Sequence, residues 1–194
     1  NYTLSEIATL TGGRLEGADL RVGRVMTDSR HSFATEQNPM FVAIGGVNHD
    51  GHAFIDDLYR RGLRAFMVER ELDFKAWPEA GFVVVERSLY ALQKVATDHR
   101  SHFRGTVVAI TGSTGKTTTK ELLATVLSTK YNLHYTQGNL NNQIGVPLTL
   151  LQITRAHELA IVEMGASHPG DIKELVDIAA PNYGLITNVG RANL

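Results

Sequence analysis

The sequence predicts an α/β protein in two parts: a small mixed α/β domain over residues 1–104, and part of a parallel-sheet domain with a phosphate-binding loop over residues 105–194. Two observations support this prediction. After residue 105, short apolar runs alternate with helix-length segments, which is typical of a parallel sheet covered by helices on both faces. A glycine-rich turn that carries a lysine and three threonines directly follows the first of these runs.

The first part is expected to contain short elements. Thr3 and Glu6 have the spacing of a capping box, which predicts a helix that ends at Gly12-Gly13. Ser88 is expected to cap a long helix that carries apolar residues on one face. Strands are expected near Leu15 and at residues 22–25, 40–44, 64–68 and 82–85, with a further helix at 53–61.

The second part is expected to repeat a strand-then-helix pattern. Strands are predicted at residues 106–111, 132–136, 158–163 and 184–189, and helices at about 116–129, within 137–152 and at about 169–179. The last strand looks buried, and the sequence ends soon after it, which suggests that further sequence is missing or disordered. Ligands of parallel sheets bind at the carboxyl ends of strands, so we expect the glycine-rich turn, Glu163 and Asn188 to share one edge.

Composition narrows the functional classes. The 194 residues are 43% hydrophobic, which is enough for a sizeable core, and the net charge of −1 argues against a nucleic-acid-binding surface. The chain has no cysteine, which excludes a disulfide scaffold and fits a reducing compartment. No apolar run has the length of a membrane span, and no signal peptide is visible.

The turn at residues 112–117 reads G-S-T-G-K-T and follows an apolar run. Glycines allow a tight turn, free N–H groups at the start of a helix attract phosphate, Lys116 adds a cation, and Thr117 adds a hydroxyl suited to Mg²⁺. The spacing is shorter than in the common phosphate loop, and the lysine favours a nucleoside triphosphate over NAD. The alternative is a glycine turn with a solvated lysine. The predicted phosphate-binding residues are Gly112, Ser113, Thr114, Gly115, Lys116, Thr117 and Thr118.

Glu163 ends an apolar run and precedes Met164-Gly165. A carboxylate at the end of a strand beside a phosphate loop is suited to hold Mg²⁺ directly or through water. The alternative is an ordinary ion-paired or solvated glutamate. We favour the metal role because the phosphate loop is expected nearby, so Thr117 and Glu163 are the predicted metal ligands.

Three other polar clusters have two interpretations each. The loop at 138–143 is rich in amides, which suit either a tight turn or recognition of a polar ligand. Asp28-Ser29-Arg30 fits a simple turn, or a site for phosphate or uracil. His49 and His52 have a His-x-x-His spacing, but nothing nearby completes a zinc site.

Four segments together resemble the Mur ligase family of peptidoglycan synthesis: TGSTGKTTTKELL, GNLNNQIGVPLTLL, EMGASHPGDIKELV and ITNVG. TDSR and FVAIGGVNHDGHAFI resemble the family's first, UDP-binding domain. The resemblance covers essentially the whole chain. It implies that residues 1–104 bind the UDP-muramoyl peptide, and that residues 105–194 are the opening part of the central ATPase domain. The family's remaining parts are absent from these residues.

The resemblance is greatest to members that add D-alanyl-D-alanine to UDP-N-acetylmuramoyl-tripeptide through an acyl phosphate. It implies ATP and Mg²⁺ as cofactors, Lys116 and Glu163 as catalytic residues, a cytoplasmic location and a monomer. It assigns Ser29, Arg30, Asn139 and Asn142 to the UDP substrate. Little or no ligation is expected from these residues alone. The family usually has histidine where this chain has Asn193, a weaker metal ligand.

Other functions stay open. A ligase of the same family that adds the third amino acid would share these motifs. A phosphate-loop kinase would need its own acceptor site, and a GTPase would need an Asn-Lys-x-Asp motif that we do not find. A non-catalytic module that binds a UDP compound is the third alternative.

Overall fold

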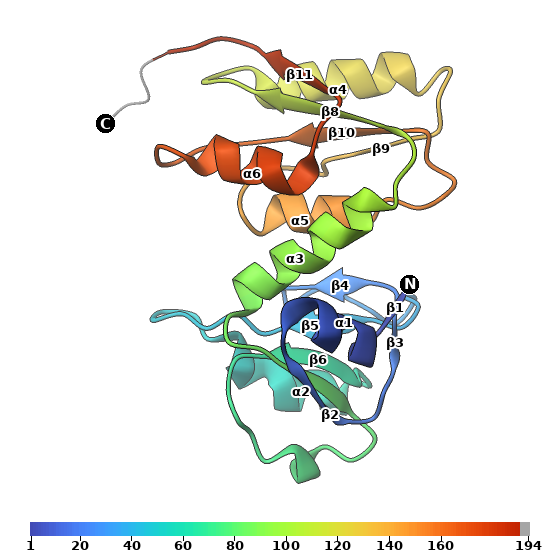
Figure 1. Cartoon of the computed structure of the whole chain (residues 1–194), viewed down its shortest axis with the longest axis vertical. Helices are drawn as coiled ribbons and strands as arrows, with labels where there is room; N and C mark the ends of the chain where they lie inside the picture. Colours follow the sequence, from blue (N-terminus) through green and yellow to red (C-terminus); the bar gives the residue numbers. More distant parts are fainter. Residues whose placement is uncertain (191–194) are drawn as a thin grey trace. The chain divides into compact units, whose positions relative to one another are not determined.

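Two α/β units make up the chain in the computed structural model, which describes residues 1–190 (Figure 1). The units are Asn1–Val95 and Ala96–Leu194, and their boundary falls within helix α3 (Ser88–Ser101). The predicted fold class is confirmed, because one unit holds a mixed sheet and the other a parallel sheet. Among residues 1–190, no helix has both the length and the apolar character needed to cross a membrane.

The first unit is built on a five-stranded sheet of order β2-β7-β6-β5-β4. Its strands are parallel except for β2, which runs antiparallel to β7. The sheet strands are β2 (Arg14–Gly17), β4 (Val25–Met26), β5 (Met40–Val42), β6 (Ala65–Val68) and β7 (Gly81–Val84). The other elements are β1 (Tyr2–Thr3), α1 (Leu4–Thr11), β3 (Arg21–Val22), η1 (Gly51–Phe54), α2 (Ile55–Arg60) and η2 (Phe74–Ala76).

The start of this unit confirms one prediction and corrects another. The capping box of Thr3 and Glu6 is present, and α1 ends at Gly12, whose φ of 70° suits glycine. The prediction of a single strand at residues 22–25 is wrong, because two separate strands, β3 and β4, lie there. Val22 pairs antiparallel with β1, whereas Val25 pairs in parallel with β5, so the two strands take different partners.

The second unit contains a four-stranded parallel sheet of order β11-β8-β10-β9. The strands are β8 (Thr106–Thr111), β9 (Leu133–Tyr135), β10 (Leu159–Glu163) and β11 (Tyr183–Ile186). The helices after α3 are α4 (Lys116–Leu127), α5 (Gly145–Leu151) and α6 (Asp171–Ala179). Figure 1 shows α4 on one face of the sheet and α5 and α6 on the other. One apolar cluster lies under α4, and a second lies under α5 and α6.

The expectation that the last strand is buried is wrong. Tyr183 and Ile186 of β11 are 68% and 64% exposed. The reason is position, because β11 is an edge strand that pairs with β8 alone among the described residues. Apolar sequence therefore correctly predicted the strand but not its burial.

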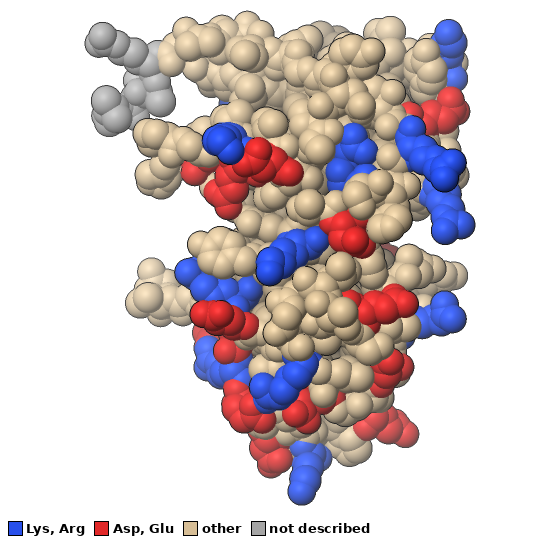
Figure 2. Space-filling model, viewed as in Figure 1, with Lys and Arg blue, Asp and Glu red and all other residues tan. Residues whose placement is uncertain are grey.

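Charge is mixed over the surface. On the face shown in Figure 2, basic and acidic side chains are interspersed and not gathered by sign. This distribution is in keeping with the net charge of −1.

Candidate functional site

The parallel sheet of the second unit brings three predicted segments to one edge. The phosphate loop follows β8 and leads into α4, Glu163 is the last residue of β10, and Asn188 lies two residues after β11. Because β11, β8 and β10 are adjacent and parallel, their carboxyl ends lie together. This edge is where open parallel sheets bind their ligands.

The phosphate loop has the backbone shape that its glycines predict. Gly112 has φ of 142° and Gly115 has φ of 80°, and both values favour glycine. The N–H groups of Lys116, Thr117 and Thr118 donate to no other residue in the described chain. They lie in the first turn of α4, where free N–H groups and the helix dipole favour an anion. Lys116 Nζ donates to Gly112 O at 2.7 Å, so this cation lies against the loop.

Glu163 is fully buried and held from several sides. Thr117 Oγ1 donates to its Oε1 at 2.8 Å, and Asn141 Nδ2 donates to its Oε2 at 2.7 Å. Lys120 Nζ lies 3.9 Å from Oε1 and donates to Gly138 O at 2.9 Å. Lys120 is also fully buried, so water does not solvate either charge. The lysine and the carboxylate of Glu163 therefore stabilise each other.

Sequence reasoning missed Lys120 and Asn141. Lys120 lies three residues after Thr117 on α4, and its position shares the apolar side of the helix with buried Ala124. A lysine on an apolar helix face was the available signal. Nothing in the sequence separated Asn141 from the other asparagines of its loop.

The two asparagines predicted to bind the UDP substrate lie elsewhere in that loop. Asn142 Oδ1 accepts hydrogen bonds from the N–H groups of Ile144 at 3.1 Å and Gly145 at 2.8 Å, at the start of α5. Asn139 is exposed. Of these three asparagines, only Asn141 contacts Glu163. The role of Asn139 and Asn142 in binding the UDP substrate stays a prediction.

The donor set beside the phosphate loop suits a hard divalent cation. The Thr117 hydroxyl and the Glu163 carboxylate are adjacent oxygen ligands of the kind that Mg²⁺ takes together with water and phosphate oxygens. Asn193, where the resemblance implies a histidine, lies outside the described residues.

In the first unit, Arg30 and Asp28 form a salt bridge with two hydrogen bonds, in the segment after β4. Arg30 donates from Nε to Asp28 Oδ1 at 2.9 Å and from Nη2 to Oδ2 at 2.7 Å. These hydrogen bonds hold the pKa of Asp28 well below its usual range. Ser29 lies between them, and its carbonyl oxygen accepts from Arg61 Nη1 at 2.8 Å. An incoming anion would have to compete with Asp28 for Arg30, whose side chain is 88% exposed.

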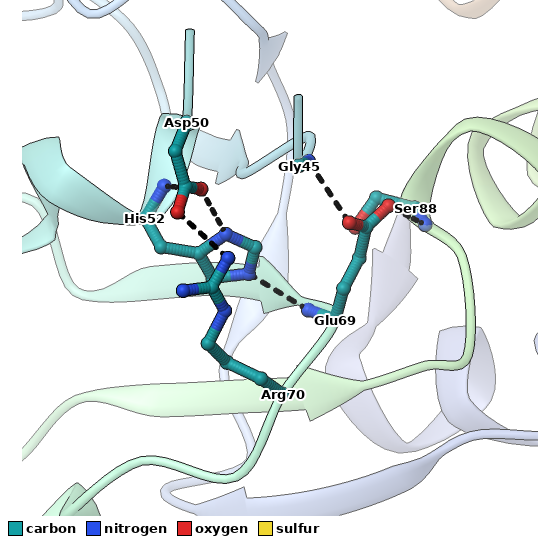
Figure 3. Close-up of polar contacts among 6 residues, drawn as sticks. All are labelled: Gly45, Asp50, His52, Glu69, Arg70 and Ser88. Atoms are coloured by element: carbon teal, nitrogen blue, oxygen red, sulfur yellow. Dashed lines mark hydrogen bonds and ion pairs between the residues drawn. The ribbon is translucent and has the colours of Figure 1, made fainter. Parts of the chain in front are cut away.

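His52 belongs to a structural network and not to a metal site (Figure 3). Its Nε2 accepts from the Glu69 N–H at 2.9 Å, so Nδ1 carries the proton and donates to Asp50 Oδ1 at 2.7 Å. Arg70 Nη2 also donates to Asp50, at 2.7 Å. The bond from His52, together with Arg70, lowers the pKa of Asp50 to about 2 despite some desolvation. Within residues 1–190, no group of three or more His, Cys, Asp or Glu side chains is placed to hold a metal ion.

The Glu69 side chain joins two segments of the same network. Its Oε2 accepts from the Gly45 N–H at 2.9 Å, and its Oε1 accepts from the Ser88 N–H at 2.7 Å (Figure 3). The start of α3 is thus capped by Glu69. The predicted capping role of Ser88 is not seen, because Ser88 Oγ has no hydrogen-bond partner in the described chain.

We expect Glu69→Gln to destabilise the first unit by about 1–3 kcal/mol, because the amide oxygen can accept from only one of the two N–H groups and the amide nitrogen leaves the other without an acceptor. The change is measured by urea unfolding, followed through the fluorescence of Trp77, which lies in this unit. Glu71→Gln is the matched control, since Glu71 is an exposed residue whose partner is Arg14, and its effect should stay within about 0.5 kcal/mol. Equal stability of the two variants would contradict the bridging role of Glu69.

Comparison with known proteins supports the geometry of the second unit. Residues 110–194 match the family described as Mur ligase middle domain. The chain is 43% identical over 176 residues to the UDP-N-acetylmuramoyl-tripeptide–D-alanyl-D-alanine ligase of Synechocystis, covering 91% of this chain and 38% of that protein. It is 38% identical to the enzyme of the same name from Escherichia coli, covering 100% of this chain and 41% of that protein.

Solved structures of ligases of the same kind also match the chain. A crystal structure of MurF from Acinetobacter baumannii matches with a TM-score of 0.86 and 34% identity, covering 100% of this chain and 42% of that one. The MurF ligase of Thermotoga maritima in complex with ADP matches with a TM-score of 0.73 and 39% identity, covering 87% of this chain and 38% of that one. The chain thus spans about two fifths of the length of the relatives it matches.

Proposed function

Because the chain belongs to the Mur ligase family, we propose that it supplies the UDP-substrate domain and the opening half of the ATPase domain of a D-alanyl-D-alanine-adding ligase. The observation that carries the proposal is one edge of a parallel sheet where Lys116, Thr117 and buried Glu163 converge. Relatives of that name match the chain at 34–43% identity.

The proposed reaction has two steps. A carboxylate of UDP-N-acetylmuramoyl-tripeptide attacks the γ-phosphorus of ATP, giving an acyl phosphate and ADP. The amine of D-alanyl-D-alanine then attacks the acyl carbon, forming the amide and releasing phosphate. In the first step the protein mainly positions the reactants and neutralises charge, which is the role proposed for Lys116 and the N–H groups that open α4.

Mg²⁺ fits the site as a hard cation between oxygen ligands and would offset phosphate charge. Thr117 and Glu163 would hold it, and Lys120 would keep the buried carboxylate in place. Ser29, Arg30, Asn139 and Asn142 are proposed to contact the UDP substrate, with the Arg30 fork released from Asp28. We further propose that the ligase acts as a monomer in the cytoplasm.

The proposal is tested with a ligase of the relatives' full length that carries this sequence. ADP formation is measured with ATP and UDP-N-acetylmuramoyl-tripeptide, and with D-alanyl-D-alanine, meso-diaminopimelate or lysine as acceptor. Of the three acceptors, we expect only D-alanyl-D-alanine to support turnover. Turnover with the single amino acids and a shorter UDP-peptide would instead indicate the third-residue-adding ligase. Binding of a UDP compound without any ATP binding would indicate a non-catalytic module.

A further inference from the structure

We propose that Asn188 is a positioning residue that holds the phosphate loop in its binding shape. It belongs to a four-residue segment after β11, Thr187–Gly190, which we name the clasp. The inference rests on the proposed function, because it takes nucleotide phosphate as the ligand of the loop. Its basis is a set of hydrogen bonds between the clasp and loop residues Ser113 and Thr114.

The backbone of the clasp binds the first half of the loop. The Ser113 N–H donates to Asn188 O at 3.2 Å, and the Gly190 N–H donates to Ser113 Oγ at 2.8 Å. Ser113 Oγ also lies 3.3 Å from Gly190 O, to which it can donate. Ser113 therefore bonds to both ends of a short span of the clasp, which limits movement of the loop.

Within residues 1–190, the hydrogen bonds of the Asn188 side chain all go to Thr114. Its Oδ1 accepts from the Thr114 N–H at 3.1 Å, while its Nδ2 donates to Thr114 O at 3.2 Å and to Thr114 Oγ1 at 2.8 Å. An amide offers an acceptor and a donor side by side, and both are matched here. Neither a carboxylate nor an apolar side chain can make the same set.

Thr187 closes the contact from the other side. Its Oγ1 donates to Thr114 O at 2.6 Å. A Cβ added at Gly112 would lie 1.9 Å from Thr187 Oγ1, so only glycine fits at the start of the loop. The clasp thus fixes residues 112–114, whereas the N–H groups of Lys116, Thr117 and Thr118 remain without protein partners in the described chain. Donors held in place before the ligand arrives bind it more tightly, because less order must be imposed on binding.

The experiment compares two asparagines at opposite ends of one strand. Asn188 follows β11, and Asn182 precedes it, where its Oδ1 accepts from the Val107 N–H at 2.8 Å. In a ligase of the relatives' full length that carries this sequence, affinity for ADP with Mg²⁺ is measured by calorimetry, and the thermal midpoint by circular dichroism. We expect Asn188→Ala to weaken ADP binding about tenfold with little change in midpoint. Asn182→Ala should lower the midpoint and leave the affinity within about twofold.

Unchanged ADP affinity in Asn188→Ala, with the unaltered ligase binding ADP, would overturn this inference and leave the proposed function standing. No ADP binding by the unaltered full-length ligase would overturn both. If Asn188→Ala does not fold, Asn188→Asp is used instead. It keeps the acceptor for Thr114 but loses both donors and adds negative charge near the phosphate, so ADP affinity as tight as in the unaltered ligase would reject the inference.

Discussion

Replacing Lys116 with alanine is expected to lower the ligation rate by about a hundredfold or more. The side chain lies against the phosphate loop, with Nζ 2.7 Å from Gly112 O, beside the N–H groups that open α4. A cation about 4 Å from a phosphate oxygen contributes roughly 4 kcal/mol at an effective dielectric constant near 20. This contribution grows as charge develops on the transferred phosphoryl group, so the loss should appear mainly in kcat.

The measurement is steady-state ADP release in a ligase of the relatives' full length, with all three substrates saturating. Lys130→Ala is the matched control, because Lys130 is an exposed lysine beyond the carboxyl end of α4. Lys116→Arg should recover part of the rate, since it keeps the charge but presents it with a different geometry. Near-normal turnover of Lys116→Ala would remove this residue from the mechanism.

The order of elements around Lys116 was predictable because its signals are local. An apolar run, a glycine turn and a helix follow one another within residues 106–127, and each depends on neighbours in the sequence. The capping box at Thr3 was predictable for the same reason. Parallel pairing then placed Glu163 at the same edge as the loop, a consequence of the alternating pattern alone.

The contacts made by individual polar side chains were not predictable. Asn139, Asn141 and Asn142 look alike in the sequence, yet only Asn141 contacts Glu163, 22 residues away. That choice depends on how the loop meets β10, which no local pattern encodes. In the same way, the exposure of β11 depends on its edge position, and its apolar sequence gives no sign of that.

Glu163→Ala is expected to raise the Mg²⁺ concentration required for half-maximal ligation by about tenfold or more. The variant removes one of the two adjacent oxygen groups proposed to hold Mg²⁺ and leaves only the Thr117 hydroxyl. It also removes the buried carboxylate that lies 3.9 Å from Lys120 Nζ and leaves exposed Glu121, at 3.4 Å, as the ion-pair partner of that lysine, so stability should fall as well. Both effects follow from the same burial, so metal requirement and stability must be measured together.

Two variants separate these effects. Glu163→Gln keeps the size of the side chain and one oxygen acceptor, so it should retain more stability than Glu163→Ala while still raising the Mg²⁺ requirement. Glu158→Gln is the control, because Glu158 precedes the same strand β10 at its opposite end and should leave the Mg²⁺ titration unchanged. If Glu163→Gln is destabilised but titrates with Mg²⁺ like the unaltered ligase, the carboxylate serves only to balance Lys120, and the metal must be held by other groups.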